Sequence, residues 1–246
     1  MQLSFISDDD LRKHLLEVVD KYLRNKKIFG ILEFNANIID PIKITLDSKI
    51  YGKDICDVVN EEVHRQIDKS NNNAIGYLHQ DIFQYIDNCQ VPKKGFDVVF
   101  DDGKRRVFVE LKNKHNTMNS SSASKTYERF REKIKEDENC VCALVEVIAV
   151  RSQNIPWKMK IDGNTYLDER IRRISIDQFY ELITNDKYAF YKLCQKIIEL
   201  LGEIVIDRKK NFSIDNEVVN ALKKIDLDPY KALFKLAFSK YMGWKE

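Results

Sequence analysis

The apolar and polar positions predict a helical N-terminal region. Residues 8–24 begin with acids, end with bases and carry apolar side chains at helical spacing, as an amphipathic helix does. Residues 57–69 and 71–89 show the same periodicity and predict a second and a third helix, the third starting on an asparagine-rich cap. Residues 28–47 have a mixed pattern, and Pro41 is expected to break any helix there.

The pattern then changes to the alternation of extended chains. In GFDVVFDDGKRRVFVELK, residues 95–112, two alternating runs flank Asp-Asp-Gly-Lys, which predicts a β-hairpin. Residues 119–138 predict a serine-capped, charged helix, and the apolar, β-branched residues 141–150 predict a central buried strand. Residues 172–185 predict a short strand leading into a helix capped near Asp177, with two or three further helices after Asp186.

This order of elements indicates an α/β fold with a mixed β-sheet flanked by helices. The 246 residues are enough for one domain with a well-buried core. We expect a single domain over residues 1–246, with its core at about 28–185 and a C-terminal helical extension, residues 186–246, packed on it. Only 4 prolines and 8 glycines occur, which argues against long linkers.

Composition indicates an ordinary globular protein, with 43% hydrophobic and 33% charged residues. No apolar run approaches the ~18–20 residues that cross a bilayer, and the N-terminus does not resemble a secretory signal. We therefore expect a cytoplasmic protein with no membrane partner. The cysteines are odd in number and lack the paired spacing of a zinc site, so structural thiols are expected. They are Cys56, Cys89, Cys140, Cys142 and Cys194.

The charge distribution is more informative than the net charge of +2. Residues 91–135 contain 12 Lys/Arg and 6 Asp/Glu, so the positive surplus gathers around the predicted hairpin. This asymmetry fits a polyanionic partner, although a solvated helix face would show it too.

The hairpin also brings acids together. If the Asp-Gly step forms a two-residue loop, Asp97 lies opposite Phe108, and Glu110 is its diagonal neighbour on the same face. Lys112 shares that face. A four-residue loop of Asp101 to Lys104 preserves this register, whereas a three-residue loop reverses the faces.

Two close carboxylates on an apolar sheet repel each other unless a cation neutralises them. Oxygen ligands favour a hard divalent ion, most plausibly Mg²⁺, which would polarise a phosphoryl oxygen and activate the attacking water. Lys112 could position that water or stabilise charge developing on the phosphate. The alternative is an exposed hairpin with a cross-strand Glu–Lys pair and an acid near a strand start.

The chain also resembles a known superfamily. The order of a helix, GFDVVF, VFVELKNK, a capped helix and VCALVEVIAV resembles the PD-(D/E)XK nuclease core. More narrowly, NIIDPIKITLD, IGYLHQDIF and VELKNKHNTMNSSSASKTYERF resemble type II restriction endonucleases that cut GGNCC-like sites. The resemblance covers residues 28 to about 182, and ELKNKHNTMNSSS is its most specific part.

The resemblance implies roles for individual residues. Asp97 and Glu110 would be metal ligands, Leu111 would lend its backbone carbonyl, and Lys112 would be the catalytic lysine. Phe96 stands where the motif has proline, a departure that leaves the chemistry intact.

Some members of the superfamily add an acid from a preceding helix, for which Glu62 and Asp81 are the candidates. A polar run, residues 113–124, leaves the expected active-site strand and enters a helix. It should therefore lie beside the DNA strand that is cut. The residues expected to bind DNA are Asn113, Lys114, His115, Asn116, Asn119 and Ser120.

The sequence thus predicts a Mg²⁺-dependent type II site-specific endodeoxyribonuclease of a prokaryotic cytoplasm. It would act on double-stranded DNA as a homodimer, cut a short near-palindromic GGNCC-like site and leave 5′-phosphates. A cognate DNA methyltransferase would be its genetic partner. The alternatives are another PD-(D/E)XK nuclease, of repair or transposition, and a non-catalytic DNA-binding module.

Overall fold

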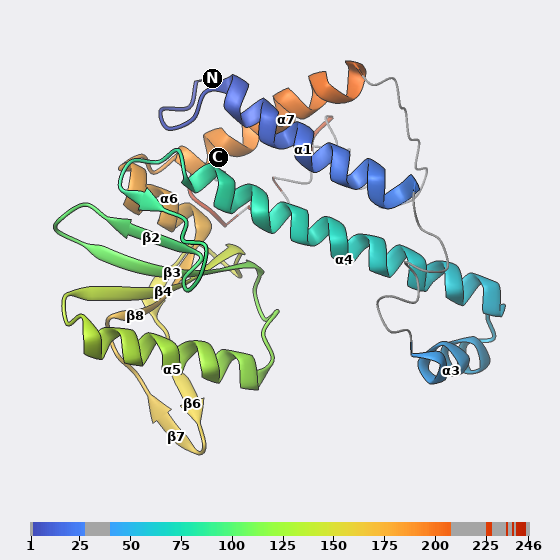
Figure 1. The fold of residues 1–246 in the computed structure, drawn as a ribbon, viewed down its shortest axis with the longest axis horizontal. Coiled ribbons are helices and arrows are strands. Elements are labelled where there is room, and N and C mark those ends of the chain that lie inside the picture. The colour runs from blue at the N-terminus through green and yellow to red at the C-terminus, as the bar shows by residue number, and fades with distance from the viewer. Residues whose placement is uncertain are drawn as a thin grey trace. The chain divides into compact units, whose positions relative to one another are not determined.

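The computed structural model describes residues 2–27, 40–207, 225–227, 235, 238 and 240–244. The chain forms two compact units, His14–Leu78 and Met1–Lys13 with His79–Glu246 (Figure 1). A single domain over residues 1–246 stays a prediction. None of the helices in the described ranges is long and apolar enough to span a membrane.

Most of the smaller unit, His14–Leu78, is helical. Helix α1, Asp8–Lys27, confirms the first predicted helix and runs three residues further. The second and third predicted helices are wrong as separate elements, because α4 is one continuous helix, Ile55–Phe83. The asparagine-rich stretch is not a cap but lies within this helix, where Asn72 donates to the Asp68 carboxylate at 2.9 Å, one turn earlier.

Helix α3, Pro41–Tyr51, begins at the proline that was expected to break a helix. Proline suits the first helical position, where a backbone N–H would have no partner within the helix. The Asp40 side chain caps this end by accepting from the N–H groups of Ile42 and Lys43, both at 3.0 Å. Residues 28–39, the rest of the stretch predicted to be irregular, lie outside the described residues.

The larger unit is built on a six-stranded sheet of order β1-β2-β3-β4-β8-β5. β3 pairs parallel with β4, and β4 parallel with β8, while the other pairs are antiparallel, so the sheet is mixed as predicted. The strands are β1 Cys89–Gln90, β2 Val98–Asp101, β3 Arg106–Lys114, β4 Cys140–Ile148, β5 Asn154–Pro156 and β8 Ile171–Ser175.

Helices α5, Ser120–Glu136, and α6, Ile176–Thr184, lie on opposite sides of this sheet (Figure 1). A small hairpin, β6 Met159–Ile161 and β7 Asn164–Tyr166, follows β5. The predicted tail is helical in α7, Ala189–Asp207, and most of its remainder lies outside the described residues. The structure confirms an α/β fold with a mixed sheet flanked by helices.

Strand β3 shows the alternation that the sequence predicted. Val107, Val109 and Leu111 are buried, whereas Glu110 and Lys112 are half-buried. On the face that α5 covers, Phe108 of β3 packs against an apolar cluster. Complete burial of such large side chains contributes about 1.5–3 kcal/mol each. The cluster contains Tyr127, Phe130, Ile134, Cys140, Cys142, Leu144, Trp157, Ile161 and Ile171.

The cysteines with described side chains are free thiols, as expected. Cys140, Cys142 and Cys194 are buried, and burial raises the pKa of the half-buried Cys89 to about 12. Unreactive thiols of this kind act as small apolar side chains.

The hairpin register differs from the predicted one by two residues. Val98 pairs with Val109, so the connection is a four-residue turn at 102–105 and not a two-residue loop. The Asp102 side chain stabilises this longer turn by accepting from the N–H groups of Lys104 and Arg105, at 2.9 and 2.7 Å. A shift of two residues changes the partners but keeps every side chain on its predicted face.

Candidate active site

Asp97 lies directly before β2 and is fixed through both its backbone and its side chain. Its N–H donates to the Val109 carbonyl at 2.9 Å, which sets it beside Glu110 of β3. Its carboxylate accepts the Leu111 N–H at 2.8 Å and the Gln80 side-chain amide at 3.1 Å. Asp97 is therefore a direct neighbour of Glu110 and not the diagonal one that the sequence predicted.

The pKa of Asp97 is raised above its ordinary value. Burial is the main cause and the negative charge of Glu110 adds to it, while the Leu111 N–H and the nearby cations oppose the rise. A half-buried carboxyl whose ionisation is disfavoured by burial and by a neighbouring acid has the electrostatics that favour binding of a cation.

Glu110 forms two ion pairs. One carboxylate oxygen accepts from the Lys112 ammonium at 2.7 Å, and the other accepts from the Arg129 guanidinium. Only 15% of the Glu110 side chain is exposed. The structure therefore brings the predicted residues Asp97, Glu110 and Lys112 together, and it shows that two protein cations pair with Glu110.

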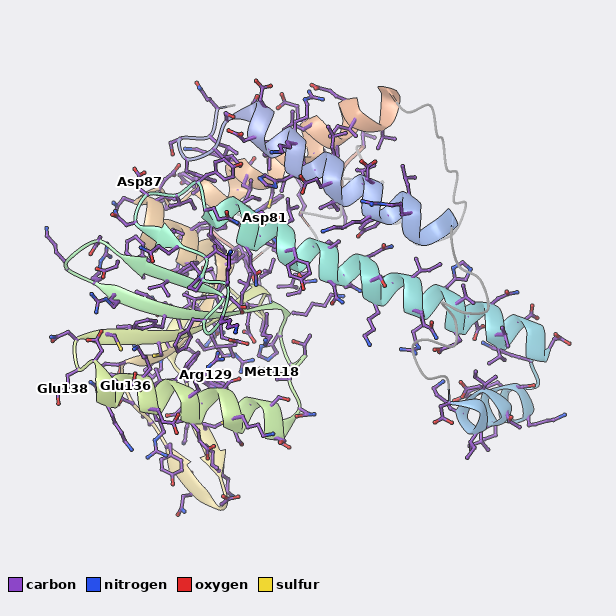
Figure 2. The ribbon with its side chains drawn as sticks, viewed as in Figure 1. Asp81, Asp87, Met118, Arg129, Glu136 and Glu138 are labelled. Carbon is purple, nitrogen blue, oxygen red and sulfur yellow. The ribbon has the colours of Figure 1, made fainter. Side chains whose placement is uncertain are left out.

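Arg129 is a site residue that the sequence reading missed. It projects from α5 into the space between that helix and the sheet (Figure 2), and its guanidinium stacks on the Phe96 ring at 4.7 Å. Phe96 also packs against Phe108, with ring centroids 5.0 Å apart. The aromatic residue in place of the motif's proline thus holds Arg129. No sequence signal separated this arginine from the other charges of α5.

Gln80 of α4, whose side-chain amide donates to Asp97, is the second site residue that the sequence did not indicate. The candidates for an additional acid, Glu62 and Asp81, are engaged elsewhere. Glu62 pairs with the Arg65 guanidinium, which lowers the pKa of Glu62 to about 2, and Asp81 accepts from Gln84 at 3.4 Å. The helical residue that contacts Asp97 is instead Gln80, which directly precedes Asp81 in the chain.

The Leu111 backbone points toward the acids. The N–H and C=O of a strand residue project from the same edge of the strand. Because the Leu111 N–H donates to Asp97, its carbonyl also lies on the edge where Asp97 sits. This placement fits the predicted use of that carbonyl as a ligand.

The residues of the polar run, predicted to bind DNA together, have different surroundings in the structure. Lys114 ends β3, Asn116 follows in a left-handed conformation with φ +57°, and both side chains are exposed. Both line a pocket of about 230 Å³ that also includes Lys112. By strand alternation Asn113 belongs to the opposite face from Lys112.

His115 faces inward. Its Nδ1 lies 3.1 Å from both carboxylate oxygens of Glu146 and 2.8 Å from the Arg173 guanidinium. Arg173 also pairs with Glu146, whose side chain is only 2% exposed. His115 was predicted to contact DNA, but its Nδ1 atom already has partners within the protein.

Asn119 and Ser120 lie at the start of α5. The Asn119 side chain accepts from the Ser122 N–H at 2.8 Å, so asparagine, not serine, is the N-cap. Ser120 is the first residue of the helix. The side-chain oxygen of Asn119 makes the capping hydrogen bond. Its side-chain NH₂ group takes no part in that bond.

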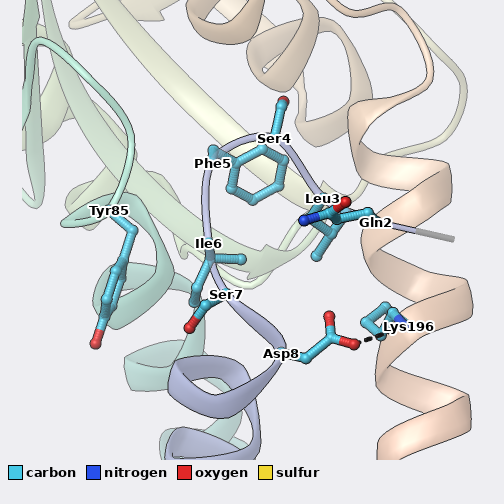
Figure 3. Close-up of a pocket in the computed structure, with 9 residues that line it drawn as sticks. All are labelled: Gln2, Leu3, Ser4, Phe5, Ile6, Ser7, Asp8, Tyr85 and Lys196. Carbon is cyan, nitrogen blue, oxygen red and sulfur yellow. Dashed lines mark hydrogen bonds and ion pairs between the residues drawn. The ribbon is translucent and has the colours of Figure 1, made fainter.

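A second pocket, of about 730 Å³, lies at the N-terminal segment 2–8 beside Tyr85 and Lys196 (Figure 3). The Lys196 ammonium there pairs with Asp8 at 3.0 Å and Glu199 at 3.1 Å. Its charge is thus compensated by the protein itself, and this pocket contributes nothing to the candidate active site.

The donor set at the edge of β2 and β3 fits a hard divalent cation. Two carboxylates and a backbone carbonyl could supply oxygen ligands. Burial and, to a smaller extent, the negative charge of Glu110 raise the pKa of Asp97, and a bound cation would favour its ionised form. The Lys112 ammonium lies next to the two carboxylates, paired with Glu110. Carboxylate ligands beside a lysine are the groups that metal-assisted hydrolysis of a phosphodiester requires.

Comparison with known proteins agrees with this geometry. Residues 3–206 match the Eco47II restriction endonuclease family, and the chain belongs to this family. It is 28% identical to the type II restriction enzyme Sau96I of Staphylococcus aureus over 203 residues, 79% of this chain and 78% of the relative. It is 26% identical to the type II restriction enzyme Eco47II of Escherichia coli over 226 residues, 87% of this chain and 94% of the relative.

Type II restriction enzymes are site-specific deoxyribonucleases that act on double-stranded DNA, and the chain is assigned this activity. The prediction of a restriction endonuclease is thereby confirmed. The two alternatives, a nuclease of repair or transposition and a non-catalytic binding module, are set aside.

Proposed function

We propose that the chain is a PD-(D/E)XK nuclease that cuts DNA with Mg²⁺ held by Asp97, Glu110 and the Leu111 carbonyl. The observation that carries this proposal is the convergence of two carboxylates and Lys112 on one face of the sheet, beside the start of β2, where burial and the negative charge of Glu110 raise the pKa of Asp97. When bound, Mg²⁺ would supply positive charge to the phosphate and activate the attacking water.

The residues of the chain have separate tasks in this proposal. Leu111 N–H and Gln80 orient the Asp97 carboxylate, so its position is fixed before DNA arrives. Lys112 leaves Glu110 to hydrogen-bond the attacking water or the charged phosphate, a stabilisation worth ~3–4 kcal/mol in comparable sites. Arg129 stays beside Glu110 and holds its carboxylate in place.

DNA would approach along the polar run. Lys114 and Asn116 are exposed and lie on the Lys112 side of the pocket, so a phosphate contact for the lysine and a base contact for the asparagine are the favoured roles. The NH₂ group of Asn119 and the hydroxyl of Ser120 lie at the start of the next helix and are secondary candidates. His115 would contribute through its outer ring nitrogen.

The enzyme would act as a homodimer, each subunit cutting one strand of a near-palindromic, GGNCC-like site and leaving a 5′-phosphate. The similarity to Sau96I and Eco47II supports this proposal. A cognate methyltransferase would protect the same sites in the host genome.

The test is a cleavage assay with controlled metal content. We expect no cleavage in EDTA, full activity with Mg²⁺ or Mn²⁺, and poor activity with Ca²⁺, whose looser coordination suits binding better than hydrolysis. Asp97→Ala, Glu110→Ala and Lys112→Ala should each reduce the rate by on the order of 10³ or more. Full cleavage in chelator, or a fully active variant that is correctly folded, would refute the proposed chemistry.

A further inference from the structure

The pocket that Lys112 shares with the polar run has basic walls, and we call it the basic pocket. It occupies about 230 Å³. Its lining comes from five parts of the chain: the end of β3 with the polar run, the start of α5, strand β4, strand β8, and residues 157–159, which lead from β5 into β6. The charged residues in this lining are Lys112, Lys114, Glu146, Lys158 and Arg173.

The charges of the basic pocket do not cancel. Its single carboxylate, Glu146, is buried and already bound to Arg173 and His115. Lys114 and Lys158 are exposed and have no ion-pair partner among the described residues. The pocket is therefore a site of positive potential that the protein itself leaves uncompensated.

Apolar side chains form part of the remaining wall of the basic pocket, beside the polar Asn116 and Thr117. Met118, Trp157 and Met159 line it, and Trp157 is buried against Tyr127 with ring centroids 5.4 Å apart. Apolar walls lower the effective dielectric and strengthen attraction for an anion. The buried Glu146 fixes Arg173 in place, so this guanidinium is already oriented before a ligand arrives.

The position of the basic pocket indicates which anion would bind in it. Lys112 lines the basic pocket and also touches Glu110, so the pocket adjoins the proposed site of phosphodiester cleavage. A strand of DNA that presents one phosphate to the acids must continue past Lys112, and its neighbouring phosphates are the anions available there.

We propose that the basic pocket holds a DNA backbone phosphate next to the scissile one, and that Lys158 is one of its ligands. This inference rests on the proposed function and extends it. It adds the segment between β5 and β6 to the DNA-binding surface, with Lys158 lying 46 positions after Lys112 in the chain. A lysine that binds phosphate positions the duplex without reading its sequence.

The chain offers a matched control two residues away. Lys158 and Lys160 are both exposed lysines of the same segment, but only Lys158 lines the basic pocket. Lys158→Ala and Lys160→Ala therefore remove the same charge from the molecule. They differ in whether that charge belongs to the pocket.

The experiment measures fluorescence anisotropy of the full-length protein on cognate and scrambled duplexes, with Ca²⁺ and at several salt concentrations. Lys158→Ala should weaken binding to both duplexes several-fold and reduce the salt slope by about 0.9, the value for one lost phosphate contact. Lys160→Ala should bind like the parent, and Lys158→Arg should restore most of the affinity. Thermal melting confirms that each variant is folded.

Other results are equally informative. If Lys158→Ala binds like the parent, or if both alanine variants lose the same affinity, the pocket assignment is wrong. These outcomes differ from failure of the proposed function, in which the parent protein itself does not cut DNA with Mg²⁺.

Discussion

Glu110 is held by two protein cations, and this arrangement has a cost for metal binding. Lys112 and Arg129 each pair with one of its oxygens. A divalent ion that binds Asp97 and Glu110 would therefore compete with positive charge already in place. Arg129 would thus limit the affinity of the acid pair for metal.

Replacing Arg129 should consequently tighten metal binding. Arg129→Met should bind Ca²⁺ several-fold more strongly by calorimetric titration, because the Asp97–Glu110 pair loses one of its two counter-charges. Arg131→Met is the control, since Arg131 also stacks on an aromatic ring, that of Tyr166 at 4.2 Å, but forms no ion pair with Glu110 in the described part of the chain. Unchanged or weaker Ca²⁺ binding by Arg129→Met would show that Arg129 does not compete with the ion.

The residues of the site were predicted unevenly. Asp97, Glu110 and Lys112 were found from the sequence because strand alternation fixes which side chains share a face. Gln80 and Arg129 were not found, because they reach the site from α4 and α5 through tertiary packing. Spacing along the chain carries no record of such contacts.

At the scale of the elements, errors came from local signals with two meanings. Pro41 can end a helix or begin one, and the asparagine-rich stretch can cap a helix or lie inside it. The hairpin turn was read as two residues because Asp-Gly favours that length, whereas Asp102 side-chain bonds stabilise four. The face assignments survived because the register moved by an even number.

Helix α5 depends on Asn119 in a way that separates capping from DNA recognition. Asn119→Ala should lower the free energy of unfolding by about 1 kcal/mol in urea titrations, since the Ser122 N–H loses its acceptor. Asn119→Ser should keep the stability, because serine is an equally good cap, but it removes the amide. If Asn119 also reads a base, the serine variant should lose ~1–3 kcal/mol of discrimination between cognate and scrambled DNA.

The results for these two variants can contradict the account. Equal stability of parent and Asn119→Ala would show that the cap contributes little to folding. Unchanged discrimination by Asn119→Ser would restrict Asn119 to capping, so that the sequence is read by other residues.

Helix α4 contains a group that makes stability sensitive to acid. Burial lowers the pKa of His79 from an ordinary 6.5 to about 4, and its Nδ1 has no hydrogen-bond partner among the described residues. Below pH 6.5 the unfolded chain takes up a proton that the folded chain refuses until about pH 4. Stability from this residue is therefore complete above pH 6.5 and falls as the pH drops through that window.

For His79 the expected loss between pH 7 and pH 5 is about 2 kcal/mol. Urea unfolding at the two pH values measures it, and His79→Leu should reduce the difference by about this amount because leucine does not titrate. A leucine variant with the same pH dependence as the parent would show that other groups cause the acid sensitivity.

At the scale of the whole molecule, the family assignment and the site geometry point to the same activity. The chain belongs to the Eco47II restriction endonuclease family, and its larger unit places two acids and a lysine on one face of a mixed sheet. A two-fold symmetric pair of such chains would cut both strands of a near-palindromic site at symmetric positions.

The most direct test of the central claim is digestion of a plasmid of known sequence with Mg²⁺, by the parent and by Lys112→Ala, with the fragment ends sequenced. The account predicts discrete fragments from the parent, all ending at one short near-palindromic site, cut symmetrically on both strands and carrying 5′-phosphates. Lys112→Ala, folded by thermal melting, should leave the plasmid uncut over the same time. A smear with ends at unrelated sequences, or undiminished cleavage by Lys112→Ala, would contradict it.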